Sequence, residues 1–141
     1  MPRYLVVANL TLGGEHLLEV LKDRAGKGDA RVHVLVPASS PPEGWHTHDM
    51  EHDIAEAQNR LSEAITAFGA LNAKEVTGEV GSSRPFDAIG DCLRANATDL
   101  FDEIILSTLP VGPSKWIAMD LPARVARNYD IPLTHVEAAE A

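Results

Sequence analysis

Two polar loops in this chain directly follow apolar runs. Tyr4 to Ala8 (YLVVA) leads into Asn9 to Gly14 (NLTLGG), and Ile104 to Leu106 leads into a loop with hydroxyls, a glycine and a lysine. Glycines at a helix start leave N–H groups open to an anion, and a lysine beside a hydroxyl adds a cation and a donor. The pattern indicates a site for a small anionic or nucleoside-like ligand. We assign to it Ala8, Asn9, Thr11, Gly13, Gly14, Val36, Ser107, Thr108, Gly112, Ser114 and Lys115.

A plainer interpretation fits the same residues. Gly13 and Gly14 form a tight turn with Thr11 as the helix cap, and this is the interpretation that we favour for the first loop. In the second loop, Ser114 and Lys115 would only face solvent. Both alternatives stay open at this point.

A second group is His46, His48 and His52 among acidic residues (HTHDMEHD). The i, i+4 spacing of His48 and His52 would let both imidazoles reach one Zn²⁺ on a helix. The alternative is a solvated helix start, in which acidic side chains complement the helix dipole. We favour the second interpretation and assign no metal.

No pairing of nucleophile and base is evident, so we expect no catalysis. The chain has no G-x-S-x-G elbow. Cys92 falls at a core-facing helical position with no histidine assigned nearby, where cysteine usually behaves as a small apolar side chain. A phosphoacceptor domain would need acidic residues where Ala8-Asn9 and Val80-Gly81 stand.

Composition limits the function classes further. The chain has 141 residues, net charge −9, 21 acidic against 12 basic residues, and a single cysteine. An acidic surface disfavours binding to nucleic acid or to an anionic membrane. A lone cysteine forms no internal disulfide, which fits a reducing cytoplasm. No stretch approaches the ~20 apolar residues of a membrane span. We expect a single cytoplasmic domain over residues 1–141.

Apolar runs and helical periodicities alternate along the chain, which predicts βαβ units in a mainly parallel sheet. We expect a five-stranded α/β fold with strand order 3-2-1-4-5 and helices on both faces. In this order the first and fourth strands are neighbours, and their connections cross to opposite faces of the sheet. We therefore expect a crevice just beyond Ala8 and Ser107. The predicted strands are Tyr4–Ala8, Val32–Val36, Glu75–Val80, Ile104–Leu106 and Leu133–Val136, and the predicted helices cover Leu17–Leu21, Asp49–Phe68, Pro85–Asn96 and Leu121–Asn128.

Several local patterns resemble the universal stress protein family over nearly the whole chain. They are YLVVA before a polar loop, VHVLVP in the second strand, GEVGSSRPFDAI around a glycine-bearing turn, and ARVARNYDIPLTHV at the last helix and strand. The resemblance implies a Rossmann-like fold of this family's type, a homodimer through the edge strand Pro132–Val136, and an adenine nucleotide as the family's ligand.

This chain lacks the residues of the family's nucleotide-binding motif. ATP-binding members carry G-x2-G-x9-G-[ST] after the fourth strand, and these positions fall on Leu106, Leu109, Met119 and Asp120. Side chains would obstruct the approach of a phosphate to the backbone. Asp120 also fits as the N-cap of the last helix, where its carboxylate would occupy the anion site.

The resulting hypothesis is a universal-stress-protein-like, non-catalytic binding or regulatory module that lacks the family's usual ATP contacts and has no cofactor. The alternative is a nucleotide-binding member with a remodelled phosphate loop that binds ATP or AMP and hydrolyses ATP slowly.

Overall fold

Strands and helices alternate along the whole described chain. The computed structural model describes residues 2–9, 11–26, 28–38, 50–109 and 120–137, with the backbone alone at 50–53. The strands are β1 Arg3–Val7, β2 Arg31–Pro37, β3 Glu75–Gly81, β4 Glu103–Thr108 and β5 Leu133–Glu137. The helices are α1 Glu15–Ala25, α2 Met50–Gly69, α3 Pro85–Ala95 and α5 Leu121–Asn128.

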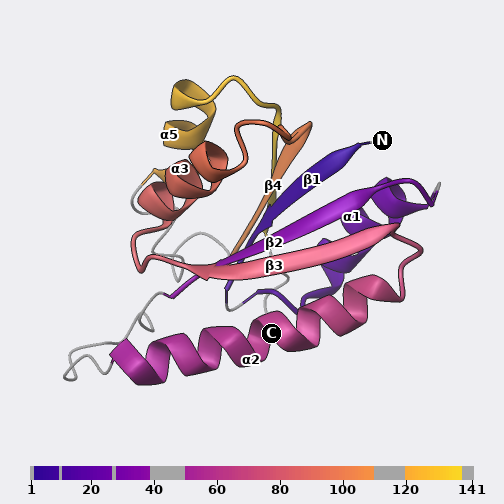
Figure 1. Ribbon diagram of the computed structural model, residues 1–141, viewed down its shortest axis with the longest axis horizontal. Coiled ribbons are helices and arrows are strands. Elements are labelled where there is room, and N and C mark those ends of the chain that lie inside the picture. Colours follow the sequence, from indigo (N-terminus) through magenta and orange to yellow (C-terminus); the bar gives the residue numbers. More distant parts are fainter. Residues whose placement is uncertain (1, 10, 27, 39–49, 110–119, 138–141) are drawn as a thin grey trace.

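The five strands form one sheet in the order β3-β2-β1-β4-β5, and every neighbouring pair is parallel. Figure 1 shows α1 and α2 on one face of this sheet and α3 and α5 on the other. The predicted fold class and strand order are therefore confirmed.

The central strands are apolar on both faces because helices cover both. In β1, Val6 packs with the α1 and α2 side of the core, whereas Leu5 and Val7 pack with the α3 and α5 side. Each of these side chains is completely buried. Such two-sided burial explains why strands of this kind have continuous apolar sequences.

The long helix α2 lies close against β3 at a glycine. A Cβ on Gly78 would clash with the Leu61 side chain of α2 and would lie 3.0 Å from the backbone oxygen of Val34. Glycine is thus required at this position by the approach of the helix. The apolar residues Ala57, Ala64 and Phe68 of α2 are buried, but Ile54 near its start is exposed.

Two side chains predicted to cap helices make no capping hydrogen bond, although Asp120 does stand at the predicted N-cap position of α5. Helix α1 begins after Gly14, which makes no side-chain cap, and Thr11 lies three residues earlier and bonds elsewhere. Asp120 precedes α5 with a φ of 58° and makes no capping hydrogen bond. Its carboxylate lies 3.7 Å from the Arg127 guanidinium instead, because the left-handed backbone turns it away from the helix N–H groups.

Candidate functional site

The candidate site lies where the chain reverses its winding direction. Strands β1 and β4 are hydrogen-bonded neighbours, with Val7 opposite Leu106, and their following segments continue from the same edge of the sheet. In doubly wound α/β sheets this switch point is where ligands bind. Among the predicted site residues, Thr11 and Ser107 bring the two segments into direct contact.

A hydrogen bond joins the two sides of this crevice. The hydroxyls of Thr11 and Ser107 lie 2.7 Å apart. Both side chains are buried, with 6% and 1% of their surface exposed. Each hydroxyl therefore finds its partner within the protein.

Both polar atoms of the Asn9 side-chain amide are also hydrogen-bonded. Its Nδ2 donates to the backbone oxygen of Pro37 at 2.6 Å, and its Oδ1 accepts from a guanidinium nitrogen of Arg60 at 2.8 Å. Only 5% of Asn9 is exposed. Arg60 also lies 3.5 Å from the Glu56 carboxylate one helical turn earlier. These contacts tie the end of β1 to the end of β2 and to the middle of α2.

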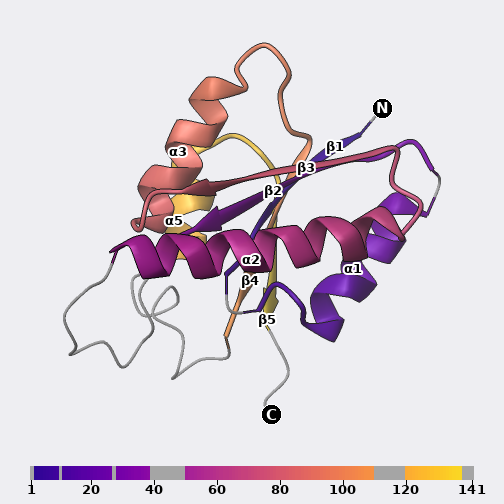
Figure 2. The same ribbon diagram turned by 60° about the horizontal axis from the view of Figure 1, so that its bottom comes forward.

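A cavity of about 390 Å³ opens beside this network, between α1 and α2. Figure 2 shows these two helices on the same face of the sheet. The floor and walls are mainly apolar, and the polar groups come from Asn9, Arg60 and Glu63. Its volume lies in the range of small-molecule sites, roughly 300–1,000 Å³.

Thr108 is held by the neighbouring edge strand. Its hydroxyl donates to the backbone oxygen of Leu109 and lies 2.8 Å from Nε2 of His135 in β5. Since the hydroxyl proton is already used, the imidazole supplies the N–H of the second bond. Thr108 thus stabilises the contact between β4 and β5.

The remaining predicted residues have varied environments. Ala8 and Val36 are completely buried, and Val36 belongs to the core on the α1 and α2 side. Gly13 is exposed with open space at its Cα, whereas the N–H of Gly14 donates to the Thr11 backbone oxygen. Gly112, Ser114 and Lys115 lie outside the described residues, as do His46, His48 and the side chain of His52.

The structure describes two of the positions where the family's phosphate motif has glycine, Leu106 and Leu109. Leu106 is a completely buried residue of β4, in the core on the α3 and α5 side. Leu109 is half-buried at the end of the described segment, and Met119 lies outside it. Leu106 therefore acts as a core residue of the strand.

Sequence reasoning missed Arg60 and the environment of Cys92. Arg60 lies between Ala57 and Ala64 at the border of the buried stripe of α2, and a basic residue at such a position was the available signal. Cys92 was expected to have no histidine nearby, and this is wrong: the Cys92 sulfur, His33 and Glu79 group together. The expected burial of Cys92 is confirmed.

The all-parallel sheet and the switch point between β1 and β4 define a doubly wound α/β fold. Within this class the chain has the universal stress protein fold. It is similar to a universal stress protein from Lactobacillus plantarum, with a TM-score of 0.68 and 12% identity over 96% of this chain and 97% of the other.

Two further structures with this fold have described ligands. One is a universal stress protein in complex with cAMP, with a TM-score of 0.62 and 18% identity over 98% of both chains. Another is an Arabidopsis thaliana universal stress family protein with AMP bound, with a TM-score of 0.65 and 10% identity over 99% of this chain and 93% of the other. No family model and no curated protein sequence matches this chain.

Among the described residues, no helix is long and apolar enough to cross a membrane.

Proposed function

We propose that this protein is a universal-stress-protein-like, non-catalytic binding or regulatory module that does not hold ATP in the family's usual way. The observation that carries this proposal is the closed hydrogen-bond network at the switch point. Thr11 and Ser107 bond to each other, and Asn9 bonds to Pro37 and Arg60. A nucleotide that used these groups would first have to break bonds between buried partners, each costing about 0.5–1.5 kcal/mol net.

Charge and sequence support the same proposal. The resemblance implies that the family's adenosine-contacting acidic residue would fall near Asn9, and here the Asn9 amide oxygen accepts a hydrogen bond from the Arg60 guanidinium. Side chains also replace the glycines of the phosphate motif at Leu106, Leu109 and Met119. The usual ribose contact and the usual phosphate contact are thus both altered.

Calorimetry on nucleotide-stripped protein tests the proposal. ATP, AMP and cAMP are titrated separately into the same preparation. We expect no saturable heat with ATP at protein concentrations of tens of micromolar. Micromolar ATP affinity would overturn the proposal.

The second candidate is a nucleotide-binding module with a remodelled phosphate loop that hydrolyses ATP slowly. It is favoured by the neighbours that hold cAMP and AMP and by the Arg60 cation beside the cavity. It predicts that Lys115→Ala weakens nucleotide binding, whereas the first proposal predicts no change because nothing is bound. An Arg127→Ala variant, on the exposed side of α5, is the matched control for loss of one positive charge.

We also propose that two copies pair through β5. This strand is one edge of the sheet, and unpaired edge N–H and C=O groups are usually covered in some way. At its end, His16 donates from Nδ1 to the Glu137 backbone oxygen, so this carbonyl is covered within the chain. The preceding residues of β5 are the proposed contact.

A cytoplasmic location and a role in a stress response complete the proposal. The location rests on the single buried cysteine, which suits a reducing compartment. The acidic net charge of −9 argues against nucleic acid and anionic membranes as partners.

A further inference from the structure

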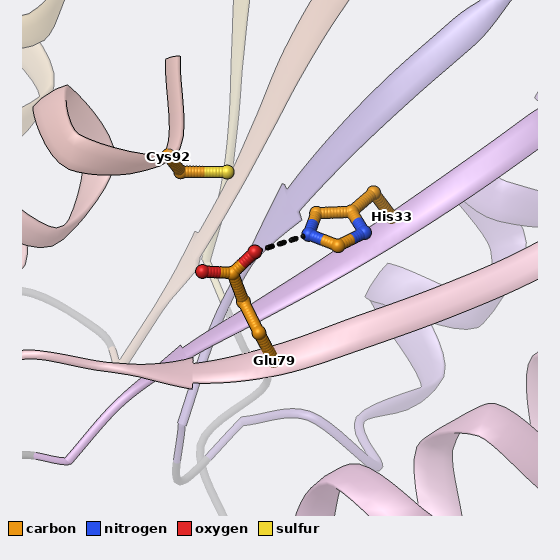
Figure 3. A group of neighbouring side chains, drawn as sticks. All are labelled: His33, Glu79 and Cys92. Atoms are coloured by element: carbon orange, nitrogen blue, oxygen red, sulfur yellow. Dashed lines mark hydrogen bonds and ion pairs between the residues drawn. The ribbon is translucent and has the colours of Figure 1, made fainter. Parts of the chain in front are cut away.

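Three chemically reactive side chains meet on the sheet face that α3 covers. They are His33 from β2, Glu79 from β3 and Cys92 from α3, and their ligand-type atoms all lie within 4.8 Å of one another. Figure 3 shows the Cys92 sulfur pointing from its helix toward the imidazole and the carboxylate. The cluster is separate from the switch-point crevice, because it uses the opposite face of the sheet from the α1–α2 cavity.

The sheet register produces this arrangement. His33 lies opposite Thr77 in the β2–β3 pair, and Glu79 lies two residues further on the same face. The His33 ring is therefore held between two side chains of β3. Its Nδ1 lies 2.7 Å from the Thr77 hydroxyl, and its Nε2 lies 2.8 Å from a Glu79 carboxylate oxygen.

The cluster is buried at one end and open at the other. Only 8% of His33 and 1% of Cys92 are exposed, whereas the Glu79 side chain is 44% exposed. An ion can therefore reach the inner ligands by displacing the carboxylate from the imidazole. The apolar surroundings would then exclude most water from the sulfur and nitrogen.

We propose that His33 Nε2, a Glu79 carboxylate oxygen and Cys92 Sγ bind a zinc-type divalent cation, with a water as the fourth ligand. Imidazole, thiolate and carboxylate are the protein groups that Zn²⁺ uses, and three of them with one open position is a common arrangement. Tetrahedral coordination sets neighbouring ligand atoms roughly 3.4 to 3.6 Å apart. His33 Nε2 and the Glu79 carboxylate oxygen now lie 2.8 Å apart, and all three ligand atoms lie within 4.8 Å of one another. Rotation of the exposed Glu79 side chain, which opens its hydrogen bond to His33, would make room for the cation.

Proton and charge balance both suit this site. On binding, the Cys92 thiol loses its proton to solvent as the sulfur–metal bond forms. With His33 Nε2 bound to the cation, the remaining imidazole proton is on Nδ1, where it donates to the Thr77 hydroxyl, as ligating histidines commonly do to an outer partner. One thiolate and one carboxylate neutralise the two positive charges, so the buried centre carries no net charge.

Cobalt(II) titration of protein purified without an affinity tag tests the proposal. Cobalt replaces zinc at such sites, and a thiolate ligand gives a charge-transfer absorption in the near ultraviolet. Because Cys92 is the only cysteine, this absorption can come from no other residue. We expect it to saturate at one equivalent and to disappear when Zn²⁺ is added.

Variants separate ligation from folding. Cys92→Ala should abolish the absorption, and Glu79→Gln, at the most exposed ligand, should weaken cobalt binding at least about tenfold while the far-ultraviolet circular dichroism stays unchanged. The control is His48→Ala with His52→Ala, which removes the other histidine pair and should leave the absorption intact. Absence of the absorption in the parent protein at saturating cobalt, or unchanged affinity in Glu79→Gln, would overturn the proposal.

Discussion

The Thr11 and Ser107 hydroxyls lie 2.7 Å apart, although 96 positions separate these residues in the chain. One residue follows β1 and the other lies in β4, so the bond connects the two segments that diverge at the switch point. Both side chains are buried, so each hydroxyl has its hydrogen-bond partner within the protein.

Loss of one of these hydroxyls should destabilise the protein. Thr11→Val leaves the buried Ser107 hydroxyl without its partner, which costs about 1–3 kcal/mol. Urea denaturation of Thr11→Val, Ser107→Ala and the double variant should give a coupling energy of at least about 0.5 kcal/mol. Thr66→Val is the matched control, since that hydroxyl bonds a backbone oxygen on the exposed face of α2 and its loss should change stability by less than about 0.5 kcal/mol. Additive single effects would contradict the direct bond.

The glycine under α2 should not accept a side chain. Gly78→Ala places a Cβ against Leu61 and close to the Val34 backbone oxygen, so we expect a loss of about 1–3 kcal/mol from overpacking. Thermal unfolding measures it. Gly69→Ala is the control, because a Cβ there meets nothing within 4 Å. Equal stability of the two variants would show that α2 does not lie this close to β3.

Acid should remove the contribution of a partly buried ion pair. Glu103 accepts from Arg24 at 2.8 Å and also bonds the Thr134 hydroxyl. The hydrogen bond from Arg24 lowers the pKa of Glu103 below its ordinary value of 4.5. Around this pKa the folded protein binds fewer protons than the unfolded chain. The stabilisation by the ion pair is therefore complete above the ordinary pKa of Glu103, and it is lost as the pH falls through the lowered pKa of the folded state.

Glu103→Gln should therefore cost about 1.5–3 kcal/mol at neutral pH, and progressively less as the pH falls below 4.5. Urea denaturation at a series of pH values measures the difference between variant and parent. Glu19→Gln, an exposed position on α1, is the control and should show little difference at either end. A cost for Glu103→Gln that does not depend on pH would contradict the role of its charge.

The fold could be predicted almost entirely from the sequence, and the reason is burial. Strands such as Tyr4–Ala8 are covered on both faces, so their sequences are continuous apolar runs, and the helices between them show clear periodicity. With parallel βαβ units, few strand orders remain. The predicted order placed Asn9 and Ser107 at one edge correctly.

Side-chain partners could not be predicted in the same way. Arg60 reaches Asn9 across 51 positions, and His33 reaches Glu79 across 46, because strand register and helix position bring them together. The residues of each pair are far apart in the sequence, so no local spacing pattern predicts that they are in contact. Thr11 was predicted to cap α1 because it precedes the helix, but its hydroxyl has a buried partner in β4 that local pattern does not reveal.

Pairing through β5 should depend on its outer edge. His135→Lys places like charges where two copies would meet, and edge lysines oppose strand pairing. Sedimentation equilibrium at tens of micromolar should show a dimer for the parent protein and a monomer for this variant. Glu75→Lys, on the opposite edge strand β3, is the control and should remain dimeric. A monomeric parent protein would reject the pairing.

The most direct test of the closed crevice is an ATP titration followed by ¹H–¹⁵N NMR of the amides of Asn9, Thr11 and Ser107. We expect these resonances to stay unchanged at millimolar ATP, because their side chains remain bonded to one another and to Pro37 and Arg60. Saturable shifts of all three at micromolar ATP would show that a nucleotide enters between β1 and β4, and would contradict the account.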